Sequence, residues 1–167
     1  NVKLSASEML SVSKTVNAVL LGSNVVVTGA SATTTLTMDA NVLILGAGSR
    51  MEVPYLTAGG TYSTTISVAA AATRSNPAQI KSILTGGTRV QKAGTGMLVL
   101  TGANEFSGEF CVQEGIVNLR NSSALGSPAS QTIVYAGAAL ELEDPSSDGS
   151  QPVNIGPEQI ELNGTGI

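Results

Sequence analysis

The chain has 167 residues and contains no His, no Trp and one Cys, with a net charge of −4. Without His there is no Ser–His or Cys–His catalytic pair and no His metal ligand, and one Cys cannot form an internal disulfide. The acidic balance without a basic stripe argues against nucleic acid, and no apolar run approaches the ~20 residues that cross a bilayer, so we expect no membrane insertion.

Short apolar runs rich in Val, Leu, Ile and Thr follow one another along the chain, and a Gly, Asn or Asp comes within a few residues of each. This pattern is typical of strands that end in turns. Only residues 76–84, with Pro77 near the start, could form a short helical turn. The sequence therefore predicts an all-β protein. In chain order the predicted strands are centred on residues 19–21, 25–28, 36–38, 42–45, 66–68, 98–100, 110–112, 117–119, 133–135, 140–142, 153–155 and 160–162.

The strands of the second half repeat at a common interval of about 20 residues. Two series share this interval, so each unit contains at least two strands in the same order. The first series lies at 98–100, 117–119, 140–142 and 160–162. The second begins at Val90 and continues at 110–112, 133–135 and 153–155.

A parallel β-helix accounts for this repeat, because each unit forms one coil and equivalent strands stack about 4.8 Å apart. Alternation places Leu98 and Leu100 in the core and Val99 outside. We expect roughly eight coils of ~20 residues that form one solenoid segment over residues 1–167. A β-sandwich is the main alternative, but it need not keep one period with matched inward residues. The predicted core column contains Leu100, Leu119, Leu142 and Leu162.

Residues 90–126 read VQKAGTGMLVLTGANEFSGEFCVQEGIVNLRNSSALG. This segment resembles the autotransporter-associated β-strand repeat, also called the passenger-associated transport repeat. It departs from the family pattern with Phe106 at a Tyr position, Phe110 near the usual Thr and Val117 at a Leu position. We take as structural motif residues Phe106 together with the residues that match the pattern, which are Lys92, Gly94, Gly96, Leu98, Leu100, Gly102, Asn104, Gly108, Val112, Gly115, Leu119, Leu125 and Gly126.

The resemblance implies a long, right-handed β-helical stalk of a bacterial secreted or cell-surface passenger. The repeat is associated with export and passenger folding, and it supplies no catalytic residues and no cofactor site. We therefore expect a non-enzymatic extracellular module that forms a stalk, fibre or sheath and displays surface for adhesion.

Charge is divided unevenly along the chain. Residues 1–104 carry a net charge of +4 and residues 105–167 a net charge of −8. In a solenoid the sequence position sets the height along the axis, and both ends present unpaired strand edges. We predict that the partners are adjacent β-helical repeats or identical subunits stacked head to tail, because opposite charges favour that polarity and a contact that does not close gives a filament.

The alternative is a glycan-binding or glycan-cleaving β-helix whose partner is a surface glycan or host receptor. Glu141 and Glu143 lie two residues apart on one strand face, at a separation of roughly 7 Å that would suit an acid–base pair. A shallow groove lined by Tyr55, Tyr62 and Tyr135 would support this alternative. The same acidic segment lacks the spacing of a calcium-binding loop, so no metal is expected.

Overall fold

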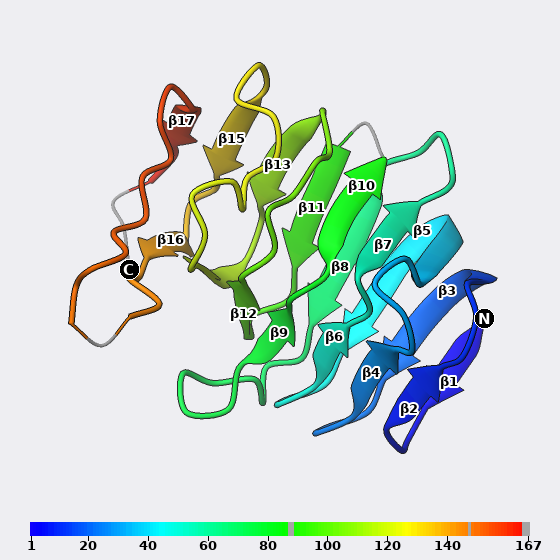
Figure 1. Cartoon of the computed structure of the whole chain (residues 1–167). Helices are drawn as coiled ribbons and strands as arrows, with labels where there is room; N and C mark the ends of the chain where they lie inside the picture. Colours follow the sequence, from blue (N-terminus) through cyan, green and yellow to red (C-terminus); the bar gives the residue numbers. More distant parts are fainter. Residues whose placement is uncertain (87–88, 147, 165–167) are drawn as a thin grey trace.

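The fold is a stack of parallel strands wound into a solenoid (Figure 1). The computed structural model describes residues 1–86, 89–146 and 148–164, which contain strands but no helix. It follows that no helix in this part of the chain is long and apolar enough to cross a membrane. The strands are β1 (Val2–Leu4), β2 (Glu8–Leu10), β3 (Lys14–Leu21), β4 (Val26–Gly29), β5 (Thr35–Leu45), β6 (Arg50–Glu52), β7 (Tyr55–Ala58), β8 (Thr64–Val68), β9 (Ala78–Ile80), β10 (Ile83–Gly86), β11 (Arg89–Ala93), β12 (Met97–Leu100), β13 (Glu109–Val112), β14 (Gly115–Leu119), β15 (Gln131–Val134), β16 (Ala138–Leu142) and β17 (Gln159–Leu162).

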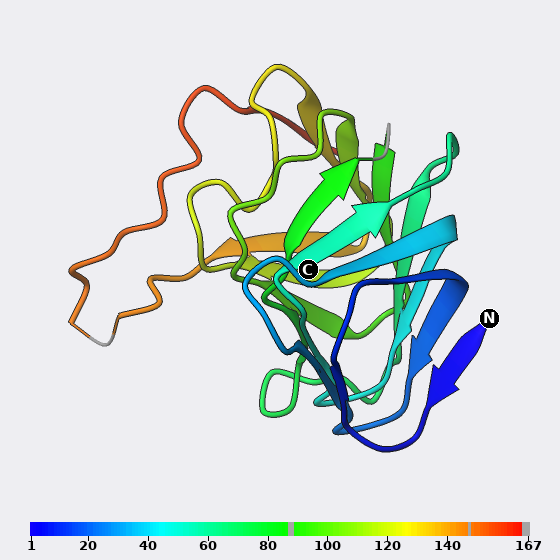
Figure 2. The same cartoon turned by 45° about the vertical axis from the view of Figure 1, so that its right-hand side comes forward.

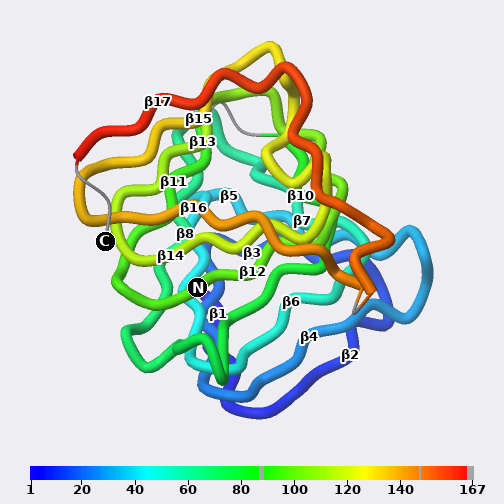
Figure 3. The backbone as a smooth tube through the Cα atoms, turned by 90° about the vertical axis from the view of Figure 1, so that its left-hand side faces the viewer, coloured from blue at the N-terminus to red at the C-terminus, as the bar shows by residue number. Residues whose placement is uncertain are grey.

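Two parallel ladders run along the stack. The first follows the order β1-β3-β5-β8-β11-β13-β15-β17, and the second follows β2-β4-β6-β9-β12-β14-β16. Neighbours within a ladder come from successive coils, so each coil contributes a strand to each ladder. Figure 3 looks along the stack from the end at β17, and the coils follow one another around a shared centre. The predicted all-β parallel solenoid is confirmed.

The solenoid has about six turns, slightly fewer than the eight predicted. Six steps lead from β2 to β16 in the second ladder. Turns are longer where the chain has corner loops: Met51 is in register with Ile80, 29 residues later, whereas Leu100 is in register with Leu119 after only 19 residues. Loops at the corners project from the stack, so one coil can have a longer loop than another while the strands keep their stacking.

The first half of the solenoid has a third side made of strands. The 11-residue strand β5 bends near Asn41, because Val16 of β3 pairs with Met38 whereas Ala18 pairs with Val42. The first part of β5 pairs with β7 and the second part with β8, and β10 extends the third side from β7. Figure 2 shows β7 and β10 beside the first part of β5. In the second half, irregular segments take this place.

More and less buried residues alternate as expected in β6, β8, β9 and β11, but not in β12. Leu98 and Leu100 are fully buried, as predicted. Val99 was predicted to face outward, and it is in register with Gln79 and Asn118 on the outer side, yet it is also fully buried. The loop between β8 and β9 lies over this part of the outer surface, because the amide N of Met97 donates to the carbonyl O of Ala72 at 2.7 Å.

Two further predictions were wrong in the last coil: the column of Leu162 and the strand at 153–155. Leu100, Leu119 and Leu142 share one column, but Leu162 pairs with Val134 in the other ladder. The connection between β16 and β17 contains residues 153–155, which form no strand, so the last predicted pair of strands was assigned to the wrong sides. Residues 78–80 form β9, so the helical turn considered as an alternative for residues 76–84 does not occur there.

Gly96 lies at a corner where two coils come very close. A Cβ atom at Gly96 would lie 2.0 Å from the carbonyl O of Ala69, which is backbone that a rotamer change cannot move. We expect Gly96→Ala to lower the free energy of unfolding by about 1–3 kcal/mol, measured by chemical denaturation. The matched control is Gly22→Ala, because its nearest atom would lie 3.3 Å away. Equal losses of unfolding free energy in the two variants would contradict the close approach of the two coils at Gly96.

Candidate functional sites at the repeat corner and the two ends

The motif residues occupy adjacent coils between β11 and the loop that follows β14. The glycines lie mainly at corners, and the aliphatic residues lie on inward faces. Lys92 lies in β11, Gly94 and Gly96 in the corner before β12, Leu98 and Leu100 in β12, Gly102, Asn104, Phe106 and Gly108 between β12 and β13, Val112 in β13, Gly115 and Leu119 in β14, and Leu125 and Gly126 before β15.

Lys92 is the unexpected member of this set, because its side chain is fully buried. It occupies an inward column between Ile66 and Val112. Its Nζ donates to the carbonyl O of Gly94 at 2.5 Å and to the carbonyl O of Glu114 at 2.7 Å. Burial lowers the pKa of Lys92 to about 8, and the nearby Glu114 carboxylate partly opposes this shift.

The two carbonyl groups bound by Lys92 belong to corners of successive coils. Gly94 has a φ of 77° and Gly115, which follows Glu114, has a φ of 70°. Both values lie in the left-handed region that glycine adopts readily. The ammonium therefore joins two tight corners from inside the solenoid. Its burial and its two hydrogen bonds fit a structural cation and leave the amine inaccessible as a nucleophile.

Asn104 joins three coils on the irregular side of the solenoid. Its Oδ1 accepts a hydrogen bond from the amide N of Leu84 at 2.9 Å, and its Nδ2 donates to the carbonyl O of Ala124 at 2.6 Å. The side chain is 5 % exposed. These side-chain bonds add to the backbone bonds between the same coils, from Glu105 N to Leu84 O at 2.8 Å and from Asn104 N to Ser123 O at 3.0 Å.

The rings of Phe106 and Phe110 fill the core beside Asn104. Their centroids are 6.0 Å apart and the ring planes meet at 29°. Both side chains are 1 % exposed. A Cβ atom at Gly126 would lie 2.5 Å from the carbonyl O of Phe106, so a glycine there allows the next coil to approach. Through these contacts the motif residues pack one coil against the next.

The carboxylates considered for acid–base chemistry are held in ion pairs on the outer surface. Glu141 accepts from Nη1 and Nη2 of Arg74 at 3.0 and 2.5 Å. Hydrogen bonding from Arg74 is the main cause that holds the pKa of Glu141 below its usual range. Glu143 pairs with Nη2 of Arg120 at 2.9 Å and accepts from Nδ2 of Asn118 at 2.9 Å. A general acid needs a raised pKa, and the pKa of Glu141 is lowered. The ion pair between Arg74 and Glu141 instead connects the loop before β9 to β16.

The three tyrosines of the glycan alternative lie apart. Tyr55 is in β7 on the third side, Tyr62 is in the loop after β7 and is 80 % exposed, and Tyr135 follows β15 several coils away. They do not form one aromatic groove. Cys111 is buried between two inward-facing neighbours, and burial is the main cause that raises the pKa of its thiol.

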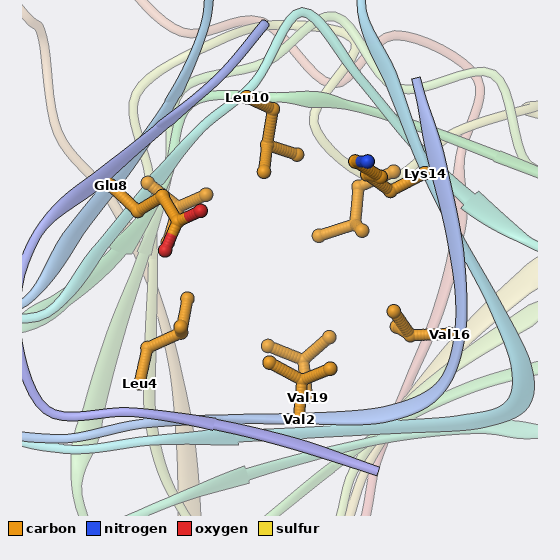
Figure 4. A pocket seen from close by; sticks show the side chains of 9 residues that line it. Val2, Leu4, Glu8, Leu10, Lys14, Val16 and Val19 are labelled. Carbon is orange, nitrogen blue, oxygen red and sulfur yellow. The ribbon is translucent and has the colours of Figure 1, made fainter. Parts of the chain in front are cut away.

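The N-terminal end of the solenoid leaves its core open (Figure 4). The outer edges of β1 and β2 have no further strand partner in the described part of the chain. The opening has a volume of about 200 Å³. We call it the N-terminal opening, and it is lined by Val2, Leu4, Glu8, Leu10, Lys14, Val16, Val19, Val27 and Leu36.

The opposite end, formed by β16 and β17, also exposes apolar side chains. Leu142 is 48 % exposed and Leu162 is 72 % exposed. A cavity of about 240 Å³ lies between the two strands and includes Leu140 and Leu162. We define the C-terminal apolar edge as Leu140, Leu142, Ile160 and Leu162, the inward-facing residues of β16 and β17.

Comparison with known proteins finds a similarity to a bacterial adhesin. The chain is 32 % identical over 136 residues to a protein named Adhesin BmaC autotransporter, from Brucella suis biovar 1 (strain 1330). The match covers 80 % of this chain but only 4 % of that protein, so the chain spans a small part of its relative. No family profile matches the chain, and no solved structure matches it. The similarity and the parallel solenoid together fit an autotransporter passenger-type repeat.

Proposed function

We propose that this chain is a non-catalytic, extracellular module of a bacterial surface protein. In this proposal the stacked coils form a stiff stalk or fibre that carries adhesive surface. The similarity to a protein named as an autotransporter adhesin supports the location and the adhesive role. The observation that carries the proposal is a parallel solenoid whose successive coils are joined by two strand ladders.

We infer end-to-end stacking from the chemistry of the first and last described coils. Unpaired parallel strands accept further strands, and exposed aliphatic side chains favour a partner that removes them from water. Residues 1–104, which hold the N-terminal opening, have a net charge of +4, and residues 105–167 have −8. Opposite charges favour contact between unlike ends, and such a contact extends into a filament because it does not close.

The mechanical properties of the rod depend on bonds that run along its axis. Backbone hydrogen bonds in both ladders connect each coil to the next, and Lys92 and Asn104 add side-chain bonds between coils. A force that pulls along the axis is therefore shared by many hydrogen bonds between coils. A stalk that holds an adhesive surface away from a cell needs this resistance.

Sedimentation velocity and electron microscopy of the chain test the stacking. At high protein concentration and low salt we expect rods whose lengths are multiples of one solenoid. Raising the ionic strength shortens the Debye length, so the charged part of the attraction weakens and the rods shorten. A monodisperse monomer under all these conditions would contradict the stacking.

Adhesion is tested with beads that carry the folded chain. We expect them to attach to cultured epithelial cells more strongly than beads that carry heat-denatured chain. Removal of surface glycans from the cells by glycosidases then separates a glycan partner from a protein receptor, since only the former loses binding. Equal attachment of folded and denatured chain would contradict the adhesive role.

A further inference from the structure

The connection between β8 and β9 lies along the outer face of the second ladder and contacts the coils on both sides of it. We call residues 69–77 the strap, which is the green loop next to β9 in Figure 1. On one side, the carbonyl O of Asn76 accepts a hydrogen bond from the amide N of Gly48 at 3.1 Å. On the other side, the carbonyl O of Ala72 accepts one from the amide N of Met97 at 2.7 Å. The strap therefore bonds the preceding and the following coil through its own carbonyl groups.

Arg74 fastens the strap to β16, which belongs to a more distant coil. Its Nη1 and Nη2 donate to the two carboxylate oxygens of Glu141 at 3.0 and 2.5 Å. The same carboxylate accepts from Nδ2 of Asn118 in β14 at 3.2 Å, so the neighbouring coil helps to orient it. Arg74 is the one charged residue of the strap, and its side chain is 65 % exposed. Because exposed ion pairs are weak and are screened by salt, ionic strength acts on the strap through this pair.

Two apolar side chains of β12 lie beneath the strap. Met97 is 2 % exposed and Val99 is fully buried, although both occupy outward positions on the strand. We call these two residues the covered patch. Within the strap itself only Ala72 is buried, and residues 69–71 and 73–76 are exposed. The strap therefore hides an apolar patch from water while it buries little of its own surface.

This difference in burial separates the stability of the strap from that of the strands below it. Segments with few buried apolar contacts open at a lower free energy than packed strands do. Every residue of β12 is buried, and β12 pairs with β9 and β14 on its two sides. These ladder pairings do not include the strap, so they remain in place when it lifts away.

We propose that the strap opens and closes over the covered patch while the solenoid stays folded, and that the ion pair between Arg74 and Glu141 makes the closed state sensitive to salt. Opening uncovers Met97 and Val99 as an apolar patch on the side of the rod, and closing hides it again. All the residues involved lie in coils of the described chain, so this motion requires neither stacking of copies nor adhesion.

Hydrogen exchange of the Met97 amide, followed by NMR in the whole chain, tests the opening. This amide bonds the strap at Ala72, so it exchanges when the strap lifts. We expect Arg74→Gln to speed its exchange about two- to fivefold. In 1 M salt, where the Debye length is ~3 Å, the unchanged chain should approach the variant. The amide of Arg120, which donates to the carbonyl O of Leu100 in the preceding coil, should keep its protection throughout.

Initial rates of methionine oxidation by hydrogen peroxide test whether the patch is uncovered, since an accessible thioether is converted to the sulfoxide. The chain supplies its own references, because Met9 is 64 % exposed and Met51 is fully buried in the core. We expect oxidation of Met97 to be faster than that of Met51 and slower than that of Met9. Arg74→Gln should speed only the oxidation of Met97, by the same two- to fivefold.

Lys81→Gln is the matched control, because Lys81 forms an ion pair with Glu52 at 2.9 Å on the same face but outside the strap. It should leave the exchange and oxidation of Met97 unchanged. Equal effects of Lys81→Gln and Arg74→Gln would show that the pair with Glu141 does not hold the strap. Oxidation of Met97 as slow as that of Met51, or exchange of its amide only together with that of Arg120, would overturn the opening itself.

Discussion

Replacing Lys92 with alanine is expected to lower the free energy of unfolding by about 3–5 kcal/mol. The substitution removes a long side chain from a fully buried column and leaves a cavity. It also leaves the carbonyl groups of Gly94 and Glu114 without the ammonium that bonds them. Lys92→Met is the matched variant, because it keeps most of the volume and removes the charge. Its loss should be clearly smaller, as measured by urea denaturation.

The pH dependence of stability gives an independent test of the buried amine. The folded-state pKa of Lys92 is about 8, below the ordinary value of 10.5. Between these values the unfolded chain binds more protons than the folded chain, so stability rises with pH across this window. The rise attributable to Lys92 is at most about 3 kcal/mol.

Lys92→Met removes this rise, and the difference between the two unfolding curves cancels titration of Cys111 and other groups common to both proteins. Between pH 8 and 10.5 the stability of the unchanged chain should rise relative to that of Lys92→Met, as the cost of the buried charge is relieved, so the two curves should move apart. Parallel curves across this range would show that Lys92 is charged in the folded state throughout, and the account of its burial would be wrong.

Replacing Asn104 with alanine is expected to cost about 2–5 kcal/mol, because two buried backbone groups lose their partner at once. The amide of Leu84 and the carbonyl of Ala124 lie in different coils and both bond the Asn104 side chain. Hydrogen exchange provides a local measurement, since the Leu84 amide should lose protection even under conditions where the whole chain stays folded.

Asn17→Ala is the control for Asn104, because Asn17 is exposed on β3. Surface changes of this kind usually alter stability by about 0.5 kcal/mol or less. Unchanged protection of Leu84 in Asn104→Ala would show that the side chain does not connect the coils, and the packing role of the motif would fail with it.

Strand existence and strand stacking could be predicted from sequence because both depend on local patterns that repeat. The runs at 98–100 and 117–119 have the same spacing, the same inward Leu and the same glycine before them, and they lie in register. Lys92 could also have been placed inside, since it lies two residues after the inward Val90. Its charge made a surface position the default expectation.

Connections between strands could not be predicted, and this explains the errors. The segment between β16 and β17 contains an apolar run at 153–155 that resembles a strand, yet the next strand in the ladder is β17. Apolar and polar residues alternate in the same way in strands on every side of the solenoid. The alternation therefore does not show to which side a strand belongs when a long loop precedes it. Leu162 was placed in the wrong column for this reason.

The sequence by itself determined an all-β chain of parallel coils. Apolar and polar residues alternate within strands, and the strands recur about every 20 residues, so both patterns can be recognised without knowing the contacts in space. Only the tertiary structure decided the burial of Val99, the bonds of Lys92 and Asn104, and the inward position of Glu8 and Lys14 at the first coil. Each of these depends on which coil lies next to a residue in space. Neighbouring coils are separated by loops of variable length, so no local pattern specifies the contact.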